Sequence, residues 1–310
     1  MRTLFIIGNG FDLGHHLPTN YSDFKNYLVS HDNEYYEQFA FLRKNFDNNE
    51  NTGLWSSFEE TLGKASIGSL AKEEANHEFH SYADDSWSDA YHHSYQDSIK
   101  EQLSFSRELS NKFLSWIKTI NLKNYSIESY VKHDLIKTND YYLTFNYTDV
   151  LEEKYHIQND NIIHIHGRAK TNEKLIVGHN SEVKHRKYTE DEDPRIIEGE
   201  EEIEQYYLST YKNPIQNIEC HKDKLLHFIK NSDQVIVLGH SILKSQIDLE
   251  YFKFIQSSNK HLKWTIYDWK NSLECLDNEE NLNNFKNTLL LNDVKLVVYD
   301  NSGKEKILTT

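Results

Sequence analysis

The chain has 310 residues, 13% of them aromatic, so it carries enough apolar bulk for a sizeable folded core. Its 34 basic residues stand against 49 acidic ones, and this formal net charge of −15 argues against the broad basic surface that non-specific nucleic-acid binding requires. The two cysteines cannot make a disulfide framework or a four-cysteine zinc site, so we expect a cytoplasmic protein with free thiols. The sequence contains neither a secretion signal nor an apolar run long enough to span a bilayer, and we expect no membrane partner.

Three glycines follow a short apolar run at the start of the chain. Residues 4–7 read LFII, as in a buried strand, and Gly8, Gly10 and Gly14 come directly after them. Glycine permits positive φ and lets a ligand approach the backbone, and a following helix would offer free N–H groups to an anion. The stretch departs from G-x-G-x-x-G by one residue, and no Walker lysine follows. It therefore predicts either a nucleotide-binding turn or a tight strand-to-helix turn without a ligand.

Residues 22–137 are predicted to form a large helical insertion. Apolar and aromatic side chains recur there at spacings of three and four, as in Phe113, Trp116 and Ile120, and proline is absent. Within this block, residues 84–96 are polar and rich in tyrosine. We expect them on an exposed helix or loop, or in a surface for a partner.

The rest of the chain alternates short strands with helices, which is typical of a parallel sheet covered on both faces. The predicted strands are residues 141–145, 162–165, 175–177, 234–238, 263–267 and 294–298, and the predicted helices are residues 218–230, 246–255 and 281–290. With residues 4–7 as the first strand, the prediction is one α/β domain over residues 1–310 with a Rossmann-like parallel sheet. The acidic residues 182–204 are predicted to be a mobile, solvated segment.

In such a sheet, ligands bind beyond the carboxyl ends of the strands. Five turns that carry polar residues follow predicted strands, and they are residues 8–12, 146–149, 166–167, 178–180 and 239–241. Because parallel strands end at the same edge of the sheet, we expect these turns to form one polar pocket.

Histidines in and near these turns allow two kinds of chemistry. His164 and His166 alternate along a predicted strand, so both are expected to point to the same side of the sheet. Together with His179 and Asp12 they would suit zinc or manganese, although their spacing matches no known zinc motif. His166 is alternatively a general base near neutral pH, with the amide of Asn146 holding a ribose hydroxyl or a water. Asn146 is also a candidate cap for the helix that follows it.

Four stretches, in this order, resemble the bacteriophage abortive infection AbiH family. They are GNGFDLGHHLPTNYSDF from residue 8, TFNYTDVLE from residue 144, HIHG from residue 164 and VIVLGHSILKSQIDLEYF from residue 235. The resemblance implies a protein of abortive phage defence.

These motifs in turn resemble, more distantly, the sirtuin-type NAD-binding fold, where a glycine motif, an asparagine motif, a His-Gly pair and a late G-x-S occur in the same order. By this resemblance Asn146 and His166 would act at the nicotinamide ribose. The residues assigned to NAD binding are Gly8, Asn9, Gly10, Phe11, Asp12, Gly239, His240 and Ser241.

The chain also departs from the sirtuin pattern. Asp149 lies one residue later than the aspartate of the N-Y-D motif, Phe11 and Asp12 replace small residues, and the zinc-binding cysteine quartet is missing. A protein deacylase is therefore not expected. The resemblance implies an NAD glycohydrolase, with NAD as substrate and no metal. The alternatives are a metal-dependent phosphohydrolase or nuclease and a non-catalytic nucleotide sensor. The expected partners are a small nucleotide and a regulatory protein or second copy of the chain.

Overall fold

The chain divides into two compact units. The computed structural model describes residues 2–47, 53–83, 85, 87–124, 135–183, 185–243, 247–268, 275–291, 293–299 and 305–309. Unit 1 comprises residues 1–20, 114–176 and 213–310, and unit 2 comprises residues 21–113 and 177–212. Some residues of the predicted segments lie outside the described residues. They are residues 48–52, 84, 86 and 125–134 of the helical insertion, residue 184 of the acidic segment and residue 246 at the start of a predicted helix.

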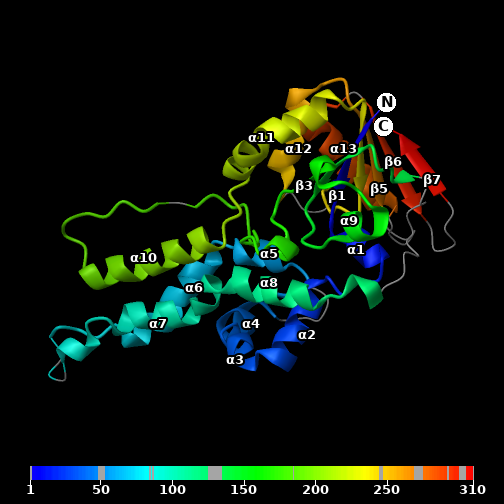
Figure 1. Ribbon diagram of the computed structural model, residues 1–310. Helices are drawn as coiled ribbons and strands as arrows, with labels where there is room; N and C mark the ends of the chain where they lie inside the picture. Colours follow the sequence, from blue (N-terminus) through cyan, green and yellow to red (C-terminus); the bar gives the residue numbers. More distant parts are fainter. Residues whose placement is uncertain are drawn as a thin grey trace. The chain divides into compact units, whose positions relative to one another are not determined.

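Unit 1 is built on a seven-stranded sheet in the order β3-β2-β1-β4-β5-β6-β7 (Figure 1). Neighbouring strands from β3 to β6 pair in parallel, and β7 pairs with β6 in the antiparallel sense. The strands are β1 (Thr3–Ile7), β2 (Tyr141–Thr144), β3 (Ile162–His164), β4 (Gln234–Leu238), β5 (Lys263–Asp268), β6 (Val294–Tyr299) and β7 (Glu305–Thr309). The predicted α/β class with a Rossmann-like parallel sheet is confirmed.

Helices occupy much of the remaining chain in both units. The α-helices are α1 (Asn9–Gly14), α2 (Tyr21–His31), α3 (Asn33–Glu37), α4 (Ala40–Phe46), α5 (Phe58–Leu62), α6 (Ser66–Ala75), α7 (Ser94–Gln102), α8 (Leu109–Thr119), α9 (Val150–Tyr155), α10 (Pro194–Ser209), α11 (Pro214–Lys230), α12 (Leu249–Ser258) and α13 (Cys275–Leu289). The short 3-10 helices are η1 (Asn76–Glu78), η2 (Asp89–Tyr91), η3 (Ser104–Arg107), η4 (Leu122–Asn124), η6 (Asn159–Asn161) and η7 (Ala169–Thr171).

The central strands of unit 1 are buried on both faces, as their unbroken apolar runs predict. Leu4 and Ile6 belong to a core with residues of α11, α12 and α13. Phe5 and Ile7 point the other way, into a core with residues of α1 and α9. Figure 1 shows these two sets of helices on the two sides of the sheet. Successive residues of a strand therefore face different helical layers, which matters for the side chains just beyond the strands.

Unit 2 has an aromatic core of its own. Phe39 contacts Trp55, Phe58 and Phe105, with ring centroids 4.4–6.1 Å apart. Such rings supply large apolar areas to short helices that could not be stable alone. Residues 22–137 were predicted to form a helical insertion, and their described part contains the helices α2 to α8. Among the described residues, no helix has the length and apolarity needed to cross a membrane.

Three segments differ from the sequence-based prediction. Residues 175–177 are not a strand: Ile176 N–H donates to the carbonyl of His166, but no ladder forms around this bond. The second half of the acidic segment is the helix α10, which begins with Asp193 accepting from the N–H of Arg195 and Pro194 in its first turn. Strand β7, at the edge of the sheet, was not predicted.

Candidate functional site

The turns after β1 and β4 lie at the point where the strand order of the sheet reverses. Chain order runs from β1 to β3 in one direction and from β4 to β6 in the other. This is the strand order of dinucleotide-binding Rossmann folds, whose ligands lie beyond the carboxyl ends of the strands at this reversal. The predicted residues Gly8 to Asp12 and Gly239 to Ser241 stand on either side of it.

The two glycine turns pack against each other, backbone to backbone. A Cβ on Gly8 would lie 2.5 Å from His240 Cα, and a Cβ on Gly10 would lie 2.8 Å from Gly239 Cα. Gly239 itself has φ +64°, in the region that favours glycine. The close packing of the two turns thus requires these glycines. From the sequence alone, this requirement cannot be told apart from a need for a ligand to approach the backbone.

Most N–H groups of the first turn are used within the protein. Gly8 N–H donates to Leu238 O at 3.0 Å, Gly10 N–H to Gly239 O at 2.7 Å and Phe11 N–H to Gly8 O at 2.9 Å. Phe11 is buried, whereas Asn9 is exposed and its Nδ2 donates to Thr19 O. The N–H groups of this turn therefore mainly stabilise the protein's own backbone, and few of them are available to bind an anion.

A partly buried carboxylate, that of Asp248, lies between two of the histidines. Asp248 Oδ1 is 3.6 Å from His166 Nε2, and Asp248 Oδ2 is 3.3 Å from His240 Nε2. The His166 and His240 side chains are 2% and 4% exposed. The ring of Phe145 contacts both imidazoles, at centroid distances of 5.1 and 4.6 Å. Tyr251 of α12 lies against His166 at 5.8 Å. The structure thus brings together His166 and His240, which are 74 positions apart.

Asn146 joins a second polar group, around the buried Asp12. Thr148 Oγ1 donates to Asp12 Oδ2 at 2.7 Å. Burial raises the pKa of Asp12 to about 6, although the Thr148 hydroxyl and the nearby Asn146 amide oppose this rise. Asp12 Oδ1 and Asn146 Nδ2 are buried and make no hydrogen bond of normal geometry to the described residues. Each is a buried polar atom that a ligand hydroxyl would satisfy. Asn146 does not cap α9, which starts at Val150.

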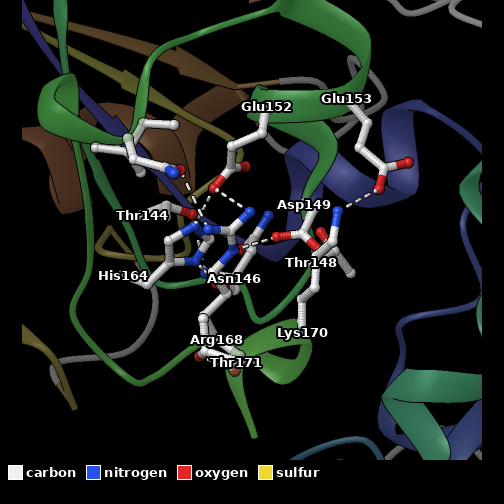
Figure 2. Close-up of polar contacts among 12 residues, drawn as sticks. Thr144, Asn146, Thr148, Asp149, Glu152, Glu153, His164, Arg168, Lys170 and Thr171 are labelled. Atoms are coloured by element: carbon white, nitrogen blue, oxygen red, sulfur yellow. Dashed lines mark hydrogen bonds and ion pairs between the residues drawn. The ribbon is translucent and has the colours of Figure 1, made fainter. Parts of the chain in front are cut away.

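His164 belongs to a third group, an ion-pair network at the end of β3 (Figure 2). Its Nε2 lies 2.9 Å from Glu152 Oε1, and its Nδ1 contacts the Asn146 carbonyl at 3.1 Å. Arg168 pairs with both Glu152, at 3.1 Å, and Asp149. Burial acts to raise the pKa of Glu152, but His164 and Arg168 together lower it below its usual value. For Asp149 burial prevails over Arg168, and the pKa is raised.

Asp149, Glu152 and His164 could together hold a metal ion, since their ligand atoms lie within 4.8 Å of one another. The guanidinium of Arg168, however, already supplies the positive charge to both carboxylates. A cation would have to displace it, so the geometry favours a structural ion-pair network.

The expectation that His164 and His166 point to the same side is wrong. His164 contacts Glu152 of α9, whereas His166 contacts Tyr251 of α12, on the other face of the sheet. β3 ends at His164 and the chain turns at Gly167, with φ +88°, so alternation along a strand no longer applies.

The turn at Gly178 and His179 belongs to unit 2 and does not follow a strand. His179 pairs with Tyr211 through its backbone, and its ring is 1% exposed between Tyr207 and Tyr211. Burial lowers the pKa of His179 to about 4, so the ring is neutral at cellular pH.

Sequence reasoning missed Asp248 as a member of the site. This residue lies in the quoted stretch QIDLEYF, but nothing in its spacing links it to His166. The available signal was an acidic residue directly before a helix that follows a turn at the carboxyl end of a strand. Arg168 was missed because its role depends on the two carboxylates that meet it in space.

The chain matches a known protein family over most of its length. Residues 4–268 match the family model described as Bacteriophage abortive infection AbiH. No curated protein matches the chain, and neither does any solved structure.

Proposed function

Because the chain belongs to the bacteriophage abortive infection AbiH family, and so to phage defence, we propose that it binds NAD and hydrolyses its nicotinamide–ribose bond. The observation that carries this proposal is the strand order β3-β2-β1-β4-β5-β6, with buried polar residues at the reversal between β1 and β4. A dinucleotide in a Rossmann fold lies across this point. The predicted sirtuin-like order of motifs supports the same ligand.

The residues at the strand ends suit such a ligand. Asp12 Oδ1, Asn146 Nδ2 and His240 Nδ1 are buried polar atoms without a hydrogen bond of normal geometry to the described residues. A buried polar atom in this state costs about 1–3 kcal/mol. Ribose hydroxyls both donate and accept, so they would satisfy the carboxylate of Asp12 and the amide of Asn146 together.

His166 is the base in the proposed reaction. Nicotinamide leaves as a neutral molecule from a cationic ring, so its departure needs little help from an acid. A water then attacks the ribose carbon, and His166 takes one of its protons as the new C–O bond forms. The products are nicotinamide, ADP-ribose and one proton. Asn146 would hold the ribose so that this attack is aligned.

The test is nicotinamide release from NAD by the purified chain. We expect His166→Ala to lower release by at least ~100-fold, because general-base catalysis contributes about that much. Asn146→Ala should also lower it. His31→Ala, at an exposed position on α2, is the matched control and should release nicotinamide at the wild-type rate. Full release by His166→Ala would remove the proposed mechanism.

The same experiment separates the alternatives. A nucleotide sensor would bind NAD, as followed by calorimetry, and release no nicotinamide. A metal-dependent phosphohydrolase would lose its activity on treatment with a chelator. Two of its predicted ligands do not converge, since His164 and His166 lie on opposite faces of the sheet.

A further inference from the structure

We propose that Asp248 is the positioning residue of the site and that it holds His166 and His240 in one tautomer with a single carboxylate. The proposal deepens the function proposed above and rests on it for the catalytic role of His166. The orientation of the two rings stands on geometry alone.

The first step concerns the position of Asp248 and the contacts of its carboxylate. It occupies the N-cap position of α12, where an aspartate usually accepts from a backbone N–H of the first turn. No such side-chain cap bond is formed here. The carboxylate instead presents one oxygen to each histidine, Oδ1 to His166 and Oδ2 to His240. The Asp248 carboxylate therefore contacts the two histidines in place of a helix-capping hydrogen bond, which would stabilise the protein by about 1 kcal/mol.

The second step is the charge of the carboxylate. Asp248 stands at the N-terminus of a ten-residue helix, where the helix dipole stabilises a negative charge. Its side chain is 13% exposed, so water screens it little. An anion held in this way attracts the N–H of a neighbouring imidazole and stabilises the imidazolium that forms when a base takes a proton.

The third step is the tautomer. Both histidines present Nε2 to the carboxylate, so Nε2 is the nitrogen that carries the proton in each ring. The hydrogen bond made by one ring nitrogen leaves the other as the acceptor. The tautomer therefore decides which ring nitrogen of His166 can take a proton. The distance of 3.6 Å from His166 Nε2 to Asp248 is longer than a hydrogen bond, and such contacts commonly shorten when substrate binds.

The packing keeps the rings in place. Phe145 meets His166 and His240 edge to face, with interplanar angles of 87° and 75°. Phe252 of α12 covers His240 from another side, at 5.2 Å. Rotation of either ring would have to displace these aromatic side chains. The carboxylate therefore selects the tautomer of rings whose positions the apolar neighbours already restrict.

The decisive measurement is the tautomer of each ring, read from ¹⁵N chemical shifts of labelled histidine in the full chain without NAD at pH 8. We expect the Nε2–H form for both His166 and His240 in the wild-type protein. The Nδ1–H form at either histidine would overturn the proposal. This measurement requires no variant and no activity, so it also stands if nicotinamide release is never observed.

Variants then test the catalytic consequence. Asp248→Asn should lower kcat at least ~10-fold, with little change in KM, because an amide can also present its N–H group to an imidazole and so favour the wrong tautomer. Asp248→Glu should restore part of kcat. Glu250→Gln, which removes a charge from the same helical turn, is the matched control and should leave kcat unchanged. Wild-type kcat and wild-type tautomers in Asp248→Asn would contradict the proposal.

Discussion

Gly10 and Gly239 lie backbone against backbone at the centre of the sheet's carboxyl edge. Gly10 N–H donates to Gly239 O at 2.7 Å, and a Cβ on Gly239 would lie 2.2 Å from Phe11 N. Both contacts join the turn after β1 to the turn after β4. The place where we propose that NAD binds is thus built on a contact that only glycine allows.

The first prediction concerns this contact. Gly239→Ala should destabilise the protein by about 2–4 kcal/mol, because it adds a backbone clash to a positive φ that alanine rarely adopts. Urea unfolding of wild type and variant measures the difference. Asn9→Ala, at the exposed neighbour in the opposite turn, should change stability by less than about 1 kcal/mol. A Gly239→Ala variant as stable as wild type would show that the two turns do not pack closely.

The sheet could largely be predicted, because β1 and β4 are continuous apolar runs buried on both faces. Helix α10 could not be, for a reason visible in its buried positions. These are Arg195, Gly199, Ile203 and Tyr206, at spacings of four, four and three. Only two of them are apolar or aromatic, so the helical period is hidden among glutamates. Arg195 is buried because its guanidinium pairs with Asp193 and stacks on aromatic rings, which depends on tertiary structure.

The candidate site was only partly predictable. Residues that follow strands, such as Asn146 and His240, were expected at the carboxyl edge, and topology alone places them there. Which of them meet depends on where each strand ends. A strand one residue longer than β3 was predicted, and this placed His166 on the wrong face. Asp248 reaches the site from a helix, so no rule about strand ends could have found it.

A second prediction tests the ion-pair network at β3. Arg168→Met should destabilise the protein by about 2–4 kcal/mol, because Asp149 and Glu152, each 11% exposed in its side chain, would lose their cation. Adding Asp149→Asn to Arg168→Met should recover part of this loss, as thermal unfolding would show. Lys170→Met, which removes an exposed ion pair with Glu153, is the control and should have little effect. Stabilisation of the wild-type protein by Zn²⁺ or Mn²⁺ would instead favour a metal at this cluster.

A third prediction follows from the raised pKa of Asp12. Since the pKa of about 6 in the folded chain lies above the usual value of 3.8, the folded state binds the proton more tightly. The stability that comes from this tighter proton binding by Asp12 is present below about pH 4 and is lost as the pH rises through 6. The free energy of unfolding of wild type relative to Asp12→Asn should therefore fall by about 2 kcal/mol between pH 4 and pH 7. A difference that does not vary with pH would mean that Asp12 is not buried as a carboxyl group.

The fourth prediction has the opposite sign and concerns His179 in unit 2. Its pKa is lowered to about 4 from the usual value of 6.5, because burial disfavours the charged form of the ring. The stability that depends on the neutral ring is present above pH 6.5 and is lost as the pH falls toward 4, by up to about 3 kcal/mol. His179→Met, which cannot be protonated, should lack this loss, so its stability relative to wild type should rise as the pH falls.

His77→Met, at an exposed histidine of the same unit, is the control and should follow the wild-type curve. Because Asp12 gains stability over the same range, the wild-type curve alone would hide both effects, and the difference between variant and wild type is what must be measured. A constant difference from pH 7 to pH 4 would contradict the burial of His179.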